Sequence, residues 1–416
     1  MKRTVALALL VSAAVAGSLL AWYSARLEGE YRGLIARGDT ALARDETFLA
    51  IEAFSGASAL QPDSMLAYLK RGDTYRRRGD LSAALRDLRK AATLDPTSTR
   101  ALEMLGDVNA DMARYERAID AYRRFVAVDD RSPRVLYKLA LASYNNGQPL
   151  AAIEPLRQAV ALDDRFSEAH HLLGACLRAS RRSDDALRSF RRAVELNPAF
   201  ATARADLADL CRELGRHREA IEQLEALTAL EPARAERRVS VALAYARLGR
   251  TDAAVTALSR AAERYPENAS IYTAIGRVWL QSAEQRVDRV ALMKALEALQ
   301  PPAARDEASS DTLALYGRAL FLAGDTDGAI RTLEQATSRL PVMPDAFVWL
   351  AAAAERRGTA QRAAEAIADY EALATVDPAN PIADRIRQSL RLQDRLQLGR
   401  RRPSLSLSRP PARRGT

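Results

Sequence analysis

Residues 65–98 read MLAYLKRGDTYRRRGDLSAALRDLRKAATLDPTS, and the spacing of a few residues within this stretch decides the fold. Gly72 stands twenty-four positions before Pro96, Ala84 stands twelve before it, and Leu88 stands eight before it. The same spacing returns at regular intervals of thirty-four positions, on a grid of proline or aspartate at Pro62, Pro96, Asp130, Asp164, Pro198, Pro232 and Pro266. Seven units in register indicate an internal repeat.

The residues of this grid describe two antiparallel helices in each repeat. The small residue and the alanine let the two helices approach closely, and the large apolar residue fills the space beside them. Gly79, Gly147, Gly215 and Gly249 mark the turn inside the pair, where a helix C-cap needs a positive φ. The proline ends the second helix, because it disfavours helical geometry in the residue before it. The sequence therefore predicts an all-α fold of about ten helix-turn-helix units.

This pattern resembles the tetratricopeptide repeat (TPR), whose small-residue, alanine, aromatic and proline positions it matches over residues 31–380. The resemblance implies a right-handed superhelical solenoid with a concave groove lined mainly by the first helix of each pair. One pair cannot bury its apolar face alone, so we expect a single cooperative stack. Between Pro266 and Pro341 the chain holds seven residues more than two repeats. We interpret Pro301–Ser309 as the loop that absorbs them, and expect irregular stacking near residues 285–309.

The two segments after the repeats differ in character. Residues 381–398 are amphipathic, with Ile382, Ile386 and Leu390 on one face, and we expect this helix to cap the end of the stack. Residues 399–416 contain six arginines and no acid, which predicts a disordered basic tail. Removing these six charges and the two of Lys2 and Arg3 from the net charge of +9 leaves about +1 for the repeats. A nearly neutral body argues against a nucleic-acid partner.

The N-terminus holds 19 residues without a charge, from Val5 to Tyr23, preceded by Lys2 and Arg3. As a helix this run would measure roughly 28 Å, close to the thickness of a bilayer's hydrocarbon core. Residues 1–25 are therefore predicted to form a signal anchor or transmembrane helix of a single-pass protein in a bacterial inner membrane, with periplasmic repeats. Two alternatives stay open: a cleaved signal that releases a soluble exported protein, or repeats on the cytoplasmic side.

The sequence shows no motif of an enzyme. It contains no phosphate-binding glycine loop, no G-x-S-x-G elbow and no H-E-x-x-H pair, and the repeats leave no room for a catalytic domain. Two cysteines and three histidines argue against a metal centre, and Cys176 and Cys211 are interpreted as small buried apolar residues. We therefore expect no enzymatic activity, no cofactor and no metal.

The family's concave positions, carried over to this chain, give the candidate partner-binding residues: Tyr137, Tyr144, Asn145, His171, Arg178, Arg212 and Glu213. In the three N-terminal units these positions hold Asp39, Asp73, Asp107 and Asp111, with Arg76 and Arg77. Tyrosine and mixed charge suit the capture of an extended peptide or a helix of a protein partner.

The function expected from this pattern is that of a non-enzymatic, membrane-anchored scaffold in envelope assembly, secretion or polysaccharide export. The alternative is a regulatory or substrate-presenting subunit of a membrane enzyme complex. The partner and the oligomeric state stay open.

Overall fold

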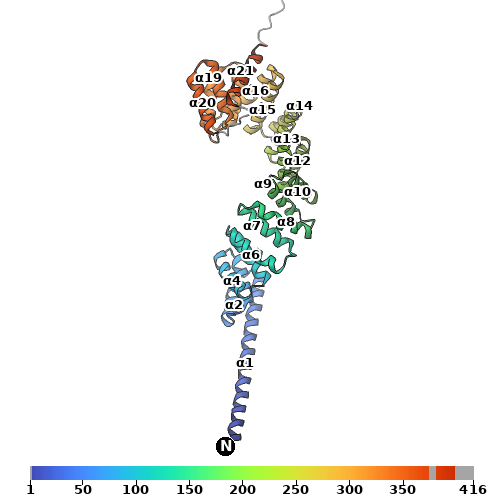
Figure 1. Cartoon of the computed structure of the whole chain (residues 1–416), viewed down its shortest axis with the longest axis vertical. Helices are drawn as coiled ribbons and strands as arrows, with labels where there is room; N and C mark the ends of the chain where they lie inside the picture. The colour runs from blue at the N-terminus through green and yellow to red at the C-terminus, as the bar shows by residue number, and fades with distance from the viewer. Residues whose placement is uncertain (1, 374–380, 399–416) are drawn as a thin grey trace, which may run out of the picture. The chain divides into compact units, whose positions relative to one another are not determined.

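The computed structural model describes the backbone of residues 2–373 and 381–398, and the side chains of residues 15–373 and 381–397. This part of the chain is entirely helical, with 21 helices and no strand (Figure 1). The predicted tail at 399–416 and the segment 374–380 lie outside the described residues.

The helices form successive pairs, followed by a single last helix. The first helices of the pairs are α1 (Lys2–Ala43), α3 (Met65–Arg77), α5 (Thr99–Asp111), α7 (Pro133–Asn145), α9 (Ser167–Ala179), α11 (Ala201–Glu213), α13 (Ala235–Arg247), α15 (Ala269–Arg286), α17 (Ser310–Ala323) and α19 (Asp345–Arg357). The second helices are α2 (Thr47–Leu60), α4 (Leu81–Leu94), α6 (Tyr115–Val128), α8 (Pro149–Leu162), α10 (Ser183–Leu196), α12 (His217–Leu230), α14 (Thr251–Arg264), α16 (Arg289–Ala303), α18 (Thr326–Ser338) and α20 (Ala360–Leu373). The last helix is α21 (Ile382–Leu398). This arrangement confirms the predicted all-helical solenoid of about ten repeats.

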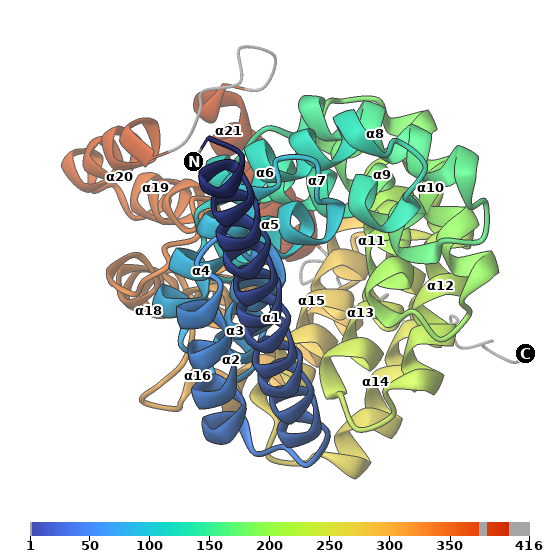
Figure 2. The ribbon, with the colours of Figure 1, turned by 90° about the horizontal axis from the view of Figure 1, so that it is seen from below.

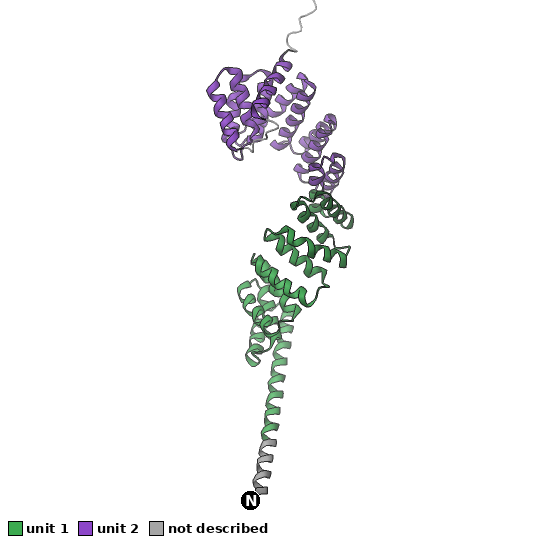
Figure 3. Ribbon diagram, in the orientation of Figure 1, with its two compact units in different colours: residues 1–206 green, residues 207–416 purple. Residues whose placement is uncertain are grey.

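The chain divides into two compact units, residues 1–206 and 207–416 (Figure 3). Within a unit, each first helix packs against its own second helix, and that second helix packs against the next first helix, as α3, α4 and α5 do. In the first unit, α8 and α10 lie outside α7 and α9 when viewed as in Figure 2. We call the surface formed by the odd-numbered helices of one unit its first-helix face.

The small residue of each repeat lies against the large apolar residue, as the spacing predicts. A Cβ atom added to Gly174 would lie 2.6 Å from Cδ1 of Phe190, and one added to Gly106 would lie 2.3 Å from Cε1 of Tyr122. Real Cβ atoms do not approach a ring this closely, so glycine is required where the partner is aromatic. The large apolar residue thus holds the two helices of its own repeat together.

The turns inside the pairs also follow the prediction. Gly79, Gly147, Gly215 and Gly249 have positive φ angles between 71° and 85°. Four other residues with positive φ are not glycine: Asp45, Ala113, Arg181 and Val287, each at the turn of its own pair. The turn geometry is therefore kept from repeat to repeat even where the residue that favours it is missing.

The seven surplus residues lie elsewhere than the sequence suggested. Gly276 packs against Leu299, twenty-three positions later, whereas in an ordinary repeat the two contacting residues are sixteen positions apart, as Gly72 and Leu88 are. From Leu299 to Leu333, its equivalent in the next repeat, the ordinary spacing of thirty-four positions returns. The surplus therefore lengthens α15 and the start of α16, and the interpretation of Pro301–Ser309 as the extra loop is wrong. Pro301 and Pro302 belong to the last turn of α16.

The N-terminal prediction needs a correction as well. Helix α1 runs without a break from the predicted anchor into the first repeat, but no helix among the described residues is long and apolar enough to cross a membrane. From residue 15 onward, a span of about 20 residues would have to include Arg26, Glu28, Glu30 and Arg32, which form ion pairs on the helix surface. This finding contradicts the prediction of a single-pass inner-membrane protein; the side chains of residues 5–14 lie outside the described ones.

Candidate functional site

A cavity of about 400 Å³ opens on the first-helix face of the first unit, between α1, α3 and α5. Its apolar lining comes from Leu42, Leu66, Leu69 and Met104. Leu66 is 40% exposed, so part of its side chain is open to solvent at this cavity. A groove with such an exposed apolar residue is the type of surface on which a partner side chain can be buried.

Charged side chains surround this apolar lining: Asp39, Lys70, Asp73, Arg77 and Arg100. Lys70 donates a hydrogen bond of 2.6 Å to Asp39, and Arg77 donates one of 3.1 Å to Asp73. Arg100 is exposed and makes no hydrogen bond or ion pair with the part of the chain that the structure describes. The rim therefore offers one uncompensated positive charge beside an apolar floor.

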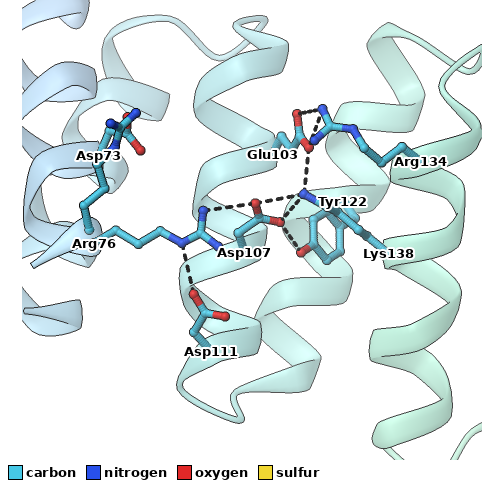
Figure 4. Close-up of polar contacts among 9 residues, drawn as sticks. Asp73, Arg76, Glu103, Asp107, Asp111, Tyr122, Arg134 and Lys138 are labelled. Atoms are coloured by element: carbon cyan, nitrogen blue, oxygen red, sulfur yellow. Dashed lines mark hydrogen bonds and ion pairs between the residues drawn. The ribbon is translucent and has the colours of Figure 1, made fainter. Parts of the chain in front are cut away.

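Next to the cavity, a cluster of charged side chains joins α3, α5 and α7 (Figure 4). Asp107 lies at its centre, where it accepts hydrogen bonds from Tyr122 Oη at 2.7 Å and Lys138 Nζ at 2.8 Å. Lys138 also donates to Glu103 at 2.7 Å, and Arg76 reaches Asp107 at 3.4 Å. Side chains of opposite charge from three successive first helices are thus held in one network.

The network is structural in character. Burial, followed by the neighbouring Asp107 charge, raises the pKa of Tyr122, so the phenol stays a hydrogen-bond donor at any physiological pH. The side chains of Asp107 and Glu103 are only 12% and 14% exposed. Partly buried acids of this kind are tolerated because each has a cationic partner. Little of their hydrogen-bonding capacity is left for a ligand.

The structure places the acids and arginines predicted for the N-terminal part of the groove on first helices, but they pair with each other or with neighbours. Glu103, Arg134 and Lys138, which the sequence reasoning missed, complete the network. Their signal was available in the sequence as opposite charges thirty-one positions apart: Asp39 and Lys70, Glu103 and Arg134, and Asp107 and Lys138. Equivalent positions of adjacent first helices are thirty-four residues apart. A pair thirty-one residues apart is therefore offset by three positions, just under one helical turn, and this offset brings the two side chains together between adjacent first helices.

The predicted groove residues on α7 and α9 occupy two kinds of environment. Tyr144 is 39% exposed and Asn145 is exposed as well. Tyr137 is half-buried, with its ring centroid 5.1 Å from that of Phe166, and burial, followed by the charge of Glu168, raises its pKa. Tyr144 and Asn145 are therefore open to a partner, whereas much of the Tyr137 ring is already covered.

His171 and Arg178, both on α9, are half-buried too. His171 Nε2 lies 2.7 Å from an Asp206 carboxylate oxygen, and its ring contacts Phe190 and Phe200. This histidine joins α9 to α11 rather than standing free in a groove. Arg212 and Glu213 are exposed, but they lie on the part of α11 assigned to the second unit, so no common site with the others is described.

The cysteines and histidines give no indication of redox or metal chemistry. Cys176 and Cys211 are both buried and unbridged, and burial raises the pKa of Cys176 to about 12. A thiol with so high a pKa is a poor nucleophile at neutral pH. Among the described side chains, no group of three or more His, Cys, Asp or Glu residues could hold a metal ion.

Comparison with known proteins identifies the repeat. Three family models described as tetratricopeptide repeat match the chain, one at residues 103–169 and 316–381, a second at 177–238 and a third at 65–108 and 235–278. A comparison with curated proteins gave no match.

Solved structures show the same type of fold. The C-terminal part of a TPR repeat-containing protein from Cytophaga hutchinsonii is 18% identical, with a TM-score of 0.50, over 58% of this chain and 99% of that one. MamA is 26% identical over 40% of this chain and 96% of its own, with a TM-score of 0.38. YrrB, described as a TPR protein with an unusual peptide-binding site, is 24% identical over 44% of this chain and 94% of its own, with a TM-score of 0.41. On the family models and the paired helices of the structure, the chain belongs to the tetratricopeptide repeat family.

Proposed function

We propose that the chain is a non-enzymatic scaffold whose first unit binds an extended or helical segment of a partner protein along its first-helix face. TPR proteins generally mediate protein–protein interactions, and the proposal assigns that role to a particular surface. The observation that carries it is the cavity between α1, α3 and α5, where Leu66 is exposed above an apolar floor and Arg100 lies unpaired at the rim. An apolar side chain of a partner, flanked by an acidic one, fits this combination.

The proposed surface continues from this cavity along the first-helix face to α7 and α9. Tyr144 and Asn145 are its exposed polar contacts there, and Arg178 lies one repeat further on. Tyrosine and arginine often carry much of the binding energy at interfaces, because they bury a large area and keep a polar contact. The predicted settings in envelope assembly, secretion or polysaccharide export depended on the membrane anchor and are not part of this proposal.

The test places a photo-crosslinking amino acid in the full chain at Leu66 and, as a matched control, at Leu150. Leu150 is a 71% exposed leucine of the same unit, but it lies on the second helix α8. A partner that binds the first-helix face is captured from Leu66 and not from Leu150. Its affinity should fall at least tenfold with Leu66→Glu, about 1.4 kcal/mol, and stay unchanged with Leu150→Glu.

Two results would contradict the proposed function. The first is equal capture from the two positions, which would mean that crosslinking reports only exposed apolar side chains. The second is an equal affinity of the wild-type chain and the Leu66→Glu chain for the captured protein. The double variant Tyr144→Ala, Arg178→Ala extends the test along the face, with an expected loss of roughly 2 kcal/mol in binding free energy.

A further inference from the structure

Helix α21 does not continue the stack of repeats in the second unit. A further first helix would pack mainly against α20, as α19 packs against α18. Instead α21 packs against α19 and α17, two successive first helices, and touches α20 mainly through a hydrogen bond from Arg385 to Tyr370. Between them, α15, α17, α19 and α21 enclose a cavity of about 250 Å³. Helix α21 therefore lies on the first-helix face of the second unit.

Ion pairs at its two ends fix the direction of α21. Near its start, Arg385 donates a hydrogen bond of 2.7 Å to Asp345 in the first turn of α19. Near its end, Asp394 accepts one of 2.8 Å from Arg356 in the last turn of α19. The two helices therefore run parallel. The face beneath α21 presents an acid at one end and a base at the other, and α21 carries the complementary charges nine positions apart.

The contact between α21 and this face is only partly apolar. Its buried stripe consists of Ile382, Ile386, Ser389, Gln393 and Leu396, so two of five inward-facing residues are polar. Gln393 Nε2 donates to the carbonyl oxygen of Phe321 at 2.6 Å, but its Oε1, although buried, has no hydrogen-bond partner. By contrast, the buried residues of α19 are all apolar. The contact of α21 thus includes one buried acceptor without a partner, a feature that also occurs at Asn109 in α5.

The face under α21 has the residues of an interaction surface. Trp349 lies at the cavity, with the Arg318 guanidinium 4.5 Å above its ring, and Arg318 forms an ion pair with the largely buried Glu284. Glu284 Oε1 and Arg318 Nε have no hydrogen-bond partner in the structure. Tryptophan and arginine are the residue types most enriched at binding hot spots. The unpaired polar atoms at the cavity are additional groups that a bound segment could satisfy.

We infer that the first-helix face of α15, α17 and α19 is a binding site for an amphipathic helix of a partner protein, and that α21 occupies this site as an internal competitor. The partner helix lies parallel to α19, with a basic residue near its start to meet Asp345 and an acidic residue nine positions later to meet Arg356. Amide or small side chains stand in the middle of its apolar stripe, opposite the end of α17. This inference concerns the second unit and does not rest on the groove proposed for the first.

Occupation by α21 has a quantitative consequence for such a partner. A segment tethered to its own site acts at an effective concentration on the order of millimolar. With micromolar intrinsic affinities for both helices, the apparent Kd of the partner rises about a thousandfold, and binding is controlled by whatever weakens the contact of α21 with α17 and α19.

The experiment uses the full chain and a fluorescent peptide with the sequence of residues 381–398. Ile386→Asp places a charge on the inward side of α21, where Ile386 is 1% exposed, and should release the helix. Ala383→Asp puts the same residue on the exposed side of the same helix and serves as the matched control. The peptide should bind the Ile386→Asp chain at least tenfold more tightly than the wild-type or the Ala383→Asp chain.

A charge exchange then tests the site and the direction. In the Ile386→Asp chain, Asp345→Arg should weaken the peptide at least threefold at low salt, and a peptide carrying Arg385→Asp should recover the loss. Hydrogen exchange of the wild-type chain gives an independent measurement, because a releasable α21 exchanges its amides faster than α17 and α19.

Five results would overturn the inference. Equal peptide binding to all three chains would place the peptide elsewhere, and a folded Ile386→Asp chain that fails to bind it would show no helix site. A peptide affinity that does not change with Asp345→Arg would refute the parallel direction of the peptide helix relative to α19. A collapse of the melting transition with Ile386→Asp, or exchange of α21 in step with α19, would make α21 part of the permanent core.

Discussion

Where the two helices of a repeat cross, the size of one side chain is set by the side chain opposite. Three of the repeats place glycine against an aromatic ring: Gly38 against Phe54, Gly106 against Tyr122 and Gly174 against Phe190. The repeat with Ala140 has Leu156 at the equivalent place, and both are fully buried. A methyl group is thus accommodated beside Leu156 and excluded beside the three rings. Leu88, Leu299 and Leu333 lie so close to their partner helix that they too face glycine.

This size matching can be tested at Gly174. Gly174→Ala should lower the free energy of unfolding by about 1–3 kcal/mol, because the added methyl group overlaps Phe190. Adding Phe190→Leu should recover much of that loss, since it recreates the alanine–leucine combination of the neighbouring repeat. Urea unfolding of the two single variants and the double variant gives the interaction free energy between positions 174 and 190. Additive losses would mean that the two residues do not limit each other.

The turn residues provide a second test. Ala113 has a φ of 54°, a conformation that costs an L-residue about 1–2 kcal/mol more than it costs glycine. Ala113→Gly should therefore stabilise the chain by about 0.5–1 kcal/mol, in spite of the greater entropy of glycine in the unfolded state. Gly147→Ala, at the same place of the next repeat with a φ of 74°, should destabilise it by a similar amount. The thermal midpoints of the two variants should shift in opposite directions.

At the scale of the helices, the charged network around Asp107 ties three first helices of the first unit together. Asp107→Ala should cost about 2–4 kcal/mol of unfolding free energy, since it leaves the Tyr122 hydroxyl without its acceptor and Lys138 with Glu103 alone, in a partly buried place. Asp107→Asn keeps an acceptor for Tyr122 and should lose less. Equal losses in denaturant unfolding would assign the effect to packing rather than to the hydrogen bonds.

The second unit contains a carboxyl group whose titration opposes ordinary acid denaturation. Burial raises the pKa of Glu284, an effect that the Arg318 charge only partly offsets. Because the pKa is higher in the folded state, that state binds more protons than the unfolded one between the ordinary and the raised value. The contribution of Glu284 to stability therefore increases as the pH falls through the raised pKa toward 4.5, the ordinary value.

Glu284→Gln removes this titration. The wild-type chain should gain stability relative to the variant when melting is measured at pH 5 instead of pH 8. A difference in melting temperature that is constant between the two pH values would show that the pKa of Glu284 is not raised.

The element scale also shows what could be predicted from the sequence and what could not. The pairing of helices was predictable because the fixed spacing between the small and the large residue survives in each ordinary repeat. The surplus of seven residues was misplaced, because Pro301 and Pro302 read as a loop, whereas the last turn of α16 accommodates them. The position of α21 was not predictable, since its amphipathic pattern states which side is buried but not which helices cover it.

For the whole chain, the repeat pattern determined the fold but only part of the candidate site. Carrying over the family's groove positions found Tyr144 and Asn145, which are exposed, and Asp39, Asp73 and Arg77 at the rim of the cavity, but not the apolar lining at Leu66. That cavity depends on three helices from three repeats, and its shape follows from packing rather than from a motif. The apolar N-terminal run predicted a membrane span that no helix among the described residues supports.

The lengthened pair α15 and α16 has a practical consequence. All seven additional residues lie beyond Gly276 and before Leu299, toward the turn at Val287 and Asp288, while the ordinary repeat spacing resumes from Leu299 onward. The turn between α15 and α16 thus already accommodates seven extra residues without a change in the register of the following repeats. A foreign epitope or reporter inserted between Val287 and Asp288 should be carried in the same way, which makes this turn a suitable attachment point for labels on an otherwise densely packed solenoid.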